Sequence, residues 1–453
     1  MSTIAAIATG NAPAGIGVIR ISGDRAIEIA DKVFQCADGS ELCSLGGYRA
    51  KFGHLLLENE SVDNAVALVF RAPKSYTGED VAELSIHGGL LVLRKTLRAV
   101  LAAGAVPAGA GEFTKRAFLN GKLDLTQAES IAEIISAEGE EQLRASFSAL
   151  KGTLSRRINE VLEILLDCSA SMAAWVDYPD EEIPELSESE LTHSLETCKE
   201  SLKTLLDGYE QGQTVTKGVD TVIAGKPNVG KSSLMNMLSR TDKSIVTHIE
   251  GTTRDIVEDS VTLGGIVLHL KDTAGLRESG DLVESIGIEK ANKAIDEAQL
   301  ILAVFDAAQA LGSDDLELIE KCRGRKAVAV LNKSDLPAVT DRETIEKAFE
   351  KTVTVSAKND EGYDALCEAV TALLGTTDFN SSAPLLANAR QRANCENAYN
   401  NIEEALGGLQ TGITYDAINV MIDSAADELL GLTGKKATTE VVNNIFSKFC
   451  VGK

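Results

Sequence analysis

The residues at 225–232 carry the side chains and the spacing that bind a nucleoside triphosphate. They fill the pattern Gly-x-x-x-x-Gly-Lys-Ser, in which two glycines frame a loop before a lysine and a serine. An apolar run at 221–224 predicts a strand before the loop, and 233–238 predicts a helix after it. Backbone N–H groups of such a loop, with those of the helix N-terminus, bind phosphate oxygens. We therefore expect Lys231 to contact the outer phosphates and the Ser232 hydroxyl to ligate Mg²⁺.

Three later segments follow in the order of a guanine-nucleotide site. In Asp272-Thr-Ala-Gly275, a carboxylate at a strand end can reach Mg²⁺ through water, and the glycine can approach a γ-phosphate. In Asn332-Lys-Ser-Asp335, the aspartate accepts two hydrogen bonds from guanine that adenine cannot donate, while the first two side chains brace the loop and cover the base. The turn at 356–358 is a third base-side segment. Each match is weak alone, but their order and spacing together fit an alternating strand and helix domain of about 160 residues. The module resembles the translation-factor-like GTPases.

The residue that orients the attacking water is not evident from the motifs. Ras-like enzymes place a glutamine after the Asp-x-x-Gly segment, and this chain has Leu276 there. The neighbouring candidates are Arg277, Glu278, Asp281 and Glu284. Upstream, the segment at 247–255 holds a threonine pair that can complete Mg²⁺ coordination once a γ-phosphate orders it. The expected GTP contacts are Asn228, Val229, Gly230, Lys231, Ser232, Ser233, Thr247, His248, Ile249, Glu250, Gly251, Thr252, Thr253, Asp272, Thr273, Ala274, Gly275, Asn332, Lys333, Asp335, Ser356, Ala357 and Lys358.

Composition narrows the range of partners. The chain has 453 residues, enough for two to four domains, and its 68 acidic and 44 basic residues give a net charge of −24. This charge argues against a large nucleic-acid surface, so any contact with RNA must be local or shared with a partner. The sequence shows no apolar run of membrane-spanning length and no cleavable leader. Eight cysteines without zinc spacing predict reduced, mostly buried thiols in a cytoplasmic protein, and the five scattered histidines predict no metal cluster.

The fold class that these patterns predict is multidomain α/β. Residues 1–120 mix strand-like and helical runs and predict a compact α+β domain. Residues 121–216 are helical in pattern, and helical character returns over 379–453. We therefore expect a Ras-like P-loop GTPase domain with a mostly parallel sheet, at 217–378, to be inserted into one helical domain built from both flanks. Within the first region we expect strands at 16–21, 65–70 and 81–86, and helices near 25–34 and 90–102.

Two further segments carry reactive side chains. The run at 111–125 groups Lys115, Arg116 and Lys122, a pattern that favours a capped helix with solvated charges over a ligand site. The chain ends in Phe-Cys-Val-Gly-Lys, and its glycine and final lysine do not suit a prenylation signal. The apolar approach at 445–449 predicts a docked tail that presents a thiol and an ammonium.

Together these segments resemble one family, the MnmE (TrmE) tRNA-modification GTPases. The segments that carry the resemblance are 15–23, 75–80, 87–89, 111–125, 177–183, the GTPase motifs and 449–453. The resemblance implies a homodimer whose N-terminal domain dimerises and binds 5-formyl-tetrahydrofolate or a related folate. It also implies a partner similar to MnmG, which brings FAD and NADH. The complex would bind certain tRNAs and add an aminomethyl-type group, commonly carboxymethylaminomethyl, to C5 of the wobble uridine.

The resemblance also implies roles for particular residues. Folate contacts fall on Arg20, Glu79, Lys122 and Lys453, and Cys450 is the family's thiol with a role in the modification chemistry. The expected metal ligands are Ser232 and Thr253 for Mg²⁺, and Asn228, Thr247, Ile249 and Thr252 for K⁺. Glu284 matches the carboxylate that orients water, and Lys231 is the second catalytic residue. The cation replaces an arginine finger, and its loop orders as two GTPase domains meet.

Some positions depart from the family pattern. His248 and Glu250 stand where Asp and Ala are commoner, but the K⁺ ligands of that loop are mainly backbone oxygens, so we expect the site to survive with altered affinity. Lys271 replaces an apolar residue, the run at 11–14 has fewer glycines, and Val451 replaces Ile. Two other functions compete with this interpretation: a K⁺-dependent GTPase of ribosome assembly, and a folate-dependent one-carbon transferase with a vestigial GTPase domain.

Overall fold

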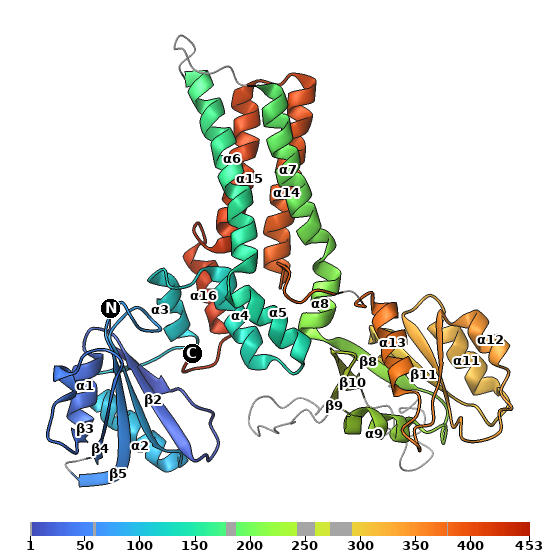
Figure 1. Ribbon diagram of the computed structural model, residues 1–453, viewed down its shortest axis with the longest axis horizontal. Coiled ribbons are helices and arrows are strands. Elements are labelled where there is room, and N and C mark those ends of the chain that lie inside the picture. The colour runs from blue at the N-terminus through green and yellow to red at the C-terminus, as the bar shows by residue number, and fades with distance from the viewer. Residues whose placement is uncertain (1, 58–59, 178–186, 242–258, 272–291, 378) are drawn as a thin grey trace. The chain divides into compact units, whose positions relative to one another are not determined.

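The protein is described by a computed structural model that covers residues 2–57, 60–177, 187–241, 259–271, 292–377 and 379–453 (Figure 1). It divides into two compact units. The first unit comprises Met1–Ala132, Ile158–Thr192 and Asn400–Lys453, and the second comprises Glu133–Arg157 and His193–Tyr399. Among the helices of the covered ranges, none is long and apolar enough to cross a membrane.

The N-terminal part of the first unit is a seven-stranded sheet with two helices on one face. The strands are β1 Ile4–Ile7, β2 Ile16–Ser22, β3 Phe34–Cys36, β4 Arg49–Leu57, β5 Glu60–Phe70, β6 Val81–His87 and β7 Val106–Pro107. Their order is β3-β4-β5-β6-β2-β1-β7, and all pairs are antiparallel except β1 with β7. Helices α1 (Ala26–Val33) and α2 (Leu90–Ala102) cover one face.

Side chains alternate along β2 between the face that α1 and α2 cover and the opposite face. Ile19 and Ile21 are fully buried beneath α1 and α2, and Gly17 lies against Leu93 of α2. Because successive side chains of a strand point to opposite faces, Arg20 lies on the face away from both helices. The expected strands and helices of this region are confirmed at β2, β5, β6, α1 and α2.

Helices make up the rest of the first unit and both ends of the second. They are α3 Glu112–Leu119, α4 Leu125–Ser136, α5 Glu140–Leu150, α6 Thr153–Asp177, α7 Glu188–Asp207, α8 Tyr209–Lys217, α14 Ala389–Thr411, α15 Tyr415–Thr433 and α16 Thr439–Ser447. In the first unit, Ser169 of α6 donates to Asp423 of α15 at 2.6 Å, and Phe446 of α16 is buried against α3 and α4. In the second unit, the Cys395 thiol of α14 is buried against the Leu202 carbonyl of α7.

The second unit holds a six-stranded sheet of the order β13-β12-β11-β8-β10-β9. The strands are β8 Val219–Ala224, β9 Asp259–Leu263, β10 Ile266–Lys271, β11 Leu300–Asp306, β12 Ala327–Asn332 and β13 Lys351–Thr354. All neighbours are parallel except β9 and β10, as the mostly parallel prediction requires. The predicted limits of 217 and 378 stay predictions, since the described sheet and its helices span Val219–Leu374.

Helices cover both faces of this sheet, which makes it doubly wound. Helices α9 (Lys231–Thr241) and α13 (Tyr363–Leu374) pack on one face, whereas α11 (Ser313–Cys322) and α12 (Arg342–Ala348) pack on the other. In such a sheet the carboxyl ends of the parallel strands meet at one edge, where ligands bind. The segments after β8, β11 and β12 therefore come together there.

Candidate functional site

The phosphate loop joins β8 to α9 at this edge. Gly225 and Gly230 have φ values of +157° and +97°, which side chains rarely adopt. A Cβ at Gly225 would lie 2.5 Å from the Val304 oxygen, and one at Gly230 would lie 2.2 Å from the Asn332 amide nitrogen. Both glycines are thus required by close packing of the loop against its neighbours.

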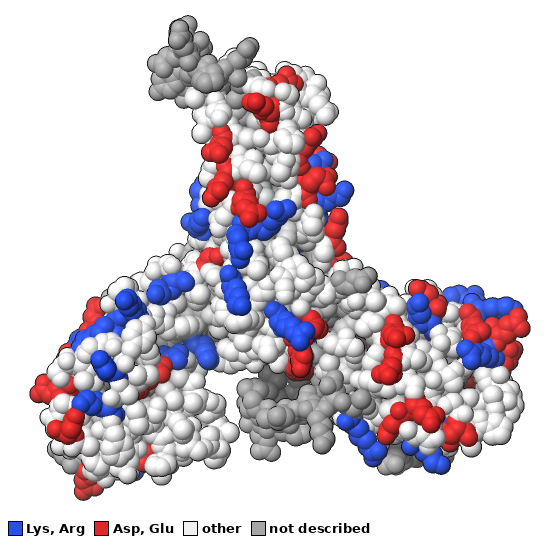
Figure 2. All heavy atoms as spheres, in the orientation of Figure 1, with Lys and Arg blue, Asp and Glu red and all other residues white. Residues whose placement is uncertain are grey.

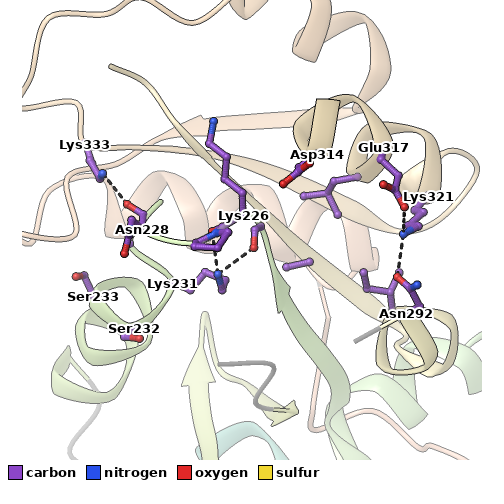
Figure 3. A pocket seen from close by; sticks show the side chains of 16 residues that line it. Lys226, Asn228, Lys231, Ser232, Ser233, Asn292, Asp314, Glu317, Lys321 and Lys333 are labelled. Atoms are coloured by element: carbon purple, nitrogen blue, oxygen red, sulfur yellow. Dashed lines mark hydrogen bonds and ion pairs between the residues drawn. The ribbon is translucent and has the colours of Figure 1, made fainter. Parts of the chain in front are cut away.

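The cationic side chain of the loop points inward. The Lys231 ammonium donates to the carbonyls of Gly225 and Lys226, each at 2.9 Å (Figure 3). Ser232 and Ser233 are exposed in the first turn of α9, with the Ser232 hydroxyl free of the core and suited to a hard cation. A cavity of about 680 Å³ lies over the loop and extends to α11.

Asn332, at the end of β12, connects the phosphate loop to the base-side turn. Its side chain is only 2% exposed. The amide nitrogen donates to the Val229 carbonyl at 2.9 Å, and the amide oxygen accepts from the Ala357 backbone N–H at 3.1 Å. One side chain thus connects Val229 and Ala357, which are 128 residues apart in the sequence (357 − 229), as expected of a residue that braces the loop.

The other two base-side residues are held in place by hydrogen bonds. The Ser356 hydroxyl donates to the Asp335 carboxylate at 2.9 Å. The Lys333 ammonium donates to the Asn228 carbonyl at 2.7 Å and to the Asp306 carboxylate at 2.7 Å. Asp335 keeps lone pairs for the two guanine donors because a carboxylate accepts about four hydrogen bonds. Lys358 is exposed on the same turn.

Two buried carboxylates were missed by motif reasoning. Asp306, at the end of β11, is 4% exposed and holds Lys333. Asp315, in the first turn of α11, is 2% exposed and pairs with Lys226 of the phosphate loop at 2.8 Å. The sequence did contain a signal for Asp306, because this carboxylate ends an apolar strand, β11, at the sheet edge where the carboxyl ends of the parallel strands meet. Asp315 had no such signal, because its partner lies 89 residues away.

Several predicted site residues lie outside the described residues. They are Thr247, His248, Ile249, Glu250, Gly251, Thr252, Thr253, Asp272, Thr273, Ala274, Gly275 and Glu284. The structure describes Lys271, the last residue of β10, directly before the Asp-x-x-Gly segment. In the described ranges, no group of three or more His, Cys, Asp or Glu side chains could hold a metal ion. The K⁺ site, the Thr253 ligand and the water-orienting carboxylate stay predictions.

The residues expected to contact folate are arranged around α3. The Arg20 guanidinium lies over the rings of Tyr76 and Phe113, 5.5 and 5.6 Å from their centroids. The Phe113 backbone N–H donates to the terminal Lys453 carbonyl at 3.2 Å. Lys122, in the turn after α3, donates to the Pro73 carbonyl at 3.1 Å.

Glu79 joins this group through a buried arginine. Its carboxylate accepts from the Ser22 hydroxyl at 2.7 Å and from Arg116 at 3.1 Å. Arg116 also pairs with Glu112 at 2.8 Å and is 4% exposed. The expectation of solvated charges is therefore wrong for Arg116, because α3 directs it into the domain between two carboxylates. Burial also raises the pKa of Tyr76, beside Arg20.

The carboxyl terminus is docked, as predicted, and it lies against the segment at the start of α3. Val451 forms an antiparallel bridge with Ala110, and the Gly111 N–H donates to the Cys450 carbonyl at 3.3 Å. Gly452 is buried, and a Cβ there would lie 2.3 Å from the Ile7 oxygen. The Cys450 thiol stays exposed.

The second unit's sheet, phosphate loop and base-side residues define a P-loop nucleotide-binding module of the guanine type. Comparisons identify the whole chain more closely. A family model described as the MnmE helical domain matches residues 125–450, and one described as the GTP-binding protein TrmE N-terminus matches residues 3–122. The chain belongs to the MnmE (TrmE) family.

Full-length relatives agree with this assignment. Proteins named tRNA modification GTPase MnmE from Symbiobacterium thermophilum and Acetivibrio thermocellus are 40% and 39% identical to it. Each alignment covers 100% of this chain and 99% of the relative. The relative of the same name from Lactococcus lactis subsp. lactis is 38% identical and is covered over 98% of its length.

Proposed function

We propose that this protein is a GTP-hydrolysing enzyme of tRNA modification. The observation that carries the GTP part is the Asn332 side chain, which ties the phosphate loop to the turn that orients Asp335. A pocket built this way binds the phosphates and the guanine edge as one unit. The tRNA part is supported by the relatives, which match over the whole chain and are named for that activity.

In the hydrolytic step, we propose that Lys231 contacts the outer phosphates and Glu284 orients the attacking water. Mg²⁺ would be held by Ser232 and Thr253, and K⁺ by Asn228 with oxygens of the segment at 247–252. When bound, both cations would supply positive charge beside the phosphate oxygens. The exposed positions of Ser232 and Asn228 at the loop support these assignments. Hydrolysis would be stimulated by K⁺ and coupled to the meeting of two GTPase modules in a homodimer.

For the modification step, we propose a folate site at α3 in the N-terminal part. Arg20, Lys122 and Lys453 suit the folate carboxylates, and Glu79 suits the donors of the pterin edge. Glu79 fits this task because its bonds to Ser22 and Arg116 orient it and leave acceptor capacity. A folate of the 5-formyl-tetrahydrofolate type would supply the one-carbon unit.

A partner similar to MnmG would carry FAD, and the complex would act on C5 of the wobble uridine of certain tRNAs in the cytoplasm. The exposed Cys450 thiol is available for that chemistry.

Mass spectrometry of tRNA nucleosides from a deletion strain tests the proposal. We expect the wobble-uridine modification to be lost, to return with the wild-type gene, and to stay absent with Lys231→Ala. Unchanged nucleosides in the deletion strain would exclude this function and favour ribosome assembly. GTP turnover that is equal in K⁺ and Na⁺ would contradict the cation assignment alone.

A further inference from the structure

A groove of the first unit lies between α3 and the turn that joins α15 to α16. Its volume is about 730 Å³, and three lysines line it: Lys115 of α3, Lys122 of the following turn, and Lys435 after α15. Phe118 and Leu119 of α3 add apolar surface, and Leu119 is 52% exposed. The groove thus combines ammonium groups with an accessible apolar wall.

A glycine places the third lysine in the groove. Gly434 ends α15 with a φ of +91°, a left-handed conformation that favours glycine. A Cβ there would lie 2.7 Å from the Leu125 Cβ and 2.9 Å from the Phe118 ring. The turn therefore closes directly onto α3 and α4, and Lys435 follows it to the same groove that Lys115 lines.

The positive charge of these lysines is not neutralised by neighbours. Each ammonium donates to a neutral oxygen, and across the part of the chain that the structure describes none of the three forms an ion pair. These bonds join Lys115 to Asn443 at 2.7 Å, Lys435 to Asn159 at 3.0 Å and Lys122 to Pro73 at 3.1 Å. By contrast, the adjacent Lys436 pairs with a carboxylate, Asp427.

One carboxylate, Asp124, also lines the groove, so three positive charges stand against one negative charge. Asp124 accepts from the Thr126 hydroxyl at 2.6 Å and from the Gln127 backbone N–H at 2.9 Å, at the start of α4. The first turn of α16 also reaches the groove through Thr439, and a helix N-terminus favours an anion. In the space-filling view, Lys and Arg side chains lie around α3, whereas both charge signs are mixed over α11 and α12 (Figure 2).

We propose that this groove binds the phosphodiester backbone of the RNA substrate, an inference that rests on the proposed function. A protein with a net charge of −24 repels a polyanion over most of its surface, so contact must be made at a local site of opposite sign. The ammonium groups of Lys115 and Lys435 lie beside apolar side chains and suit phosphates flanked by sugars, whereas Lys122 of the same groove is assigned to folate. The groove reaches the first turn of α16 at Thr439, and the docked tail with Cys450 follows the other end of the same helix.

The test compares tRNA binding by purified full-length variants. We expect Lys115→Gln with Lys435→Gln to weaken binding of an unmodified tRNA transcript at least about tenfold at 50 mM KCl. The slope of log affinity against log salt should become shallower by about 1.4 to 1.8, because two phosphate contacts are removed. Lys122 is left unchanged because it is assigned to folate. Lys115→Arg with Lys435→Arg keeps both charges and should bind like the wild type.

The matched control is Lys203→Gln with Lys347→Gln, which removes the same charge from exposed positions of α7 and α12. It should leave the tRNA affinity unchanged, and all variants should retain wild-type GTP turnover. Wild-type affinity and slope in the groove variant would overturn the inference. So would a variant that keeps tRNA binding but loses a protein partner, because the groove would then be a protein-docking surface. Neither result alters the deletion-strain nucleosides, which judge the proposed function separately.

Discussion

Removing the Asn332 side chain should uncouple the phosphate loop from the base-side turn. Asn332→Ala removes both hydrogen bonds and leaves the Val229 carbonyl and the Ala357 N–H unpaired in a buried place. At about 1 to 1.5 kcal/mol for each bond, the loss is about 2 to 3 kcal/mol. If the whole of this free energy is lost from nucleotide binding, GDP affinity decreases about 30- to 150-fold.

The assay is titration with a fluorescent GDP analogue, paired with urea unfolding of the nucleotide-free protein. The two measurements divide the loss between nucleotide affinity and fold stability. Asn359→Ala is the matched control, because Asn359 is exposed in the neighbouring turn. If Asn332→Ala binds GDP within about threefold of the wild type and unfolds within about 0.5 kcal/mol of it, the bracing argument is refuted.

Three further predictions concern other sites. Arg116→Met should destabilise the protein by about 3 kcal/mol in urea unfolding, because it leaves the mostly buried Glu79 carboxylate without its cation. Adding Glu79→Gln should recover at least about 1 kcal/mol. If stability does not recover, the two side chains do not form a direct pair. Burial raises the pKa of the Cys395 thiol to about 12, so at pH 8 it stays protonated and should resist iodoacetamide until the protein unfolds, whereas the exposed Cys450 reacts at once. Peptide mapping that finds both alkylated in the native state would refute this. Gly230→Ala should reduce GTP affinity at least about tenfold, since its Cβ would meet the Asn332 amide at a positive φ; near-wild-type affinity would show that the loop adapts.

Much of the fold could be predicted because its elements have local signals. β5, β6 and α2 carry apolar runs that identify them one at a time. β4 at Arg49–Leu57 was not predicted, since its residues do not alternate regularly and Gly53 lies within it. That glycine is needed because a Cβ would lie 2.1 Å from the Gln35 oxygen of the neighbouring strand, a contact that pairing alone creates. The division of the helices between two compact units also had no local signal.

The sequence by itself determined the class of nucleotide that this protein binds. The loop glycines act through backbone conformation, and Lys231 and the base-side segment at 332–335 act through side-chain types in a fixed order along the chain. A linear pattern records both. Only the tertiary structure decided that Arg116 is buried between carboxylates and that Asp315 holds the phosphate loop through Lys226. Those partners are brought together by packing, so the environment of each charge depends on elements far away in the sequence. The same reason explains the groove, where turns from the two ends of the chain bring lysines together.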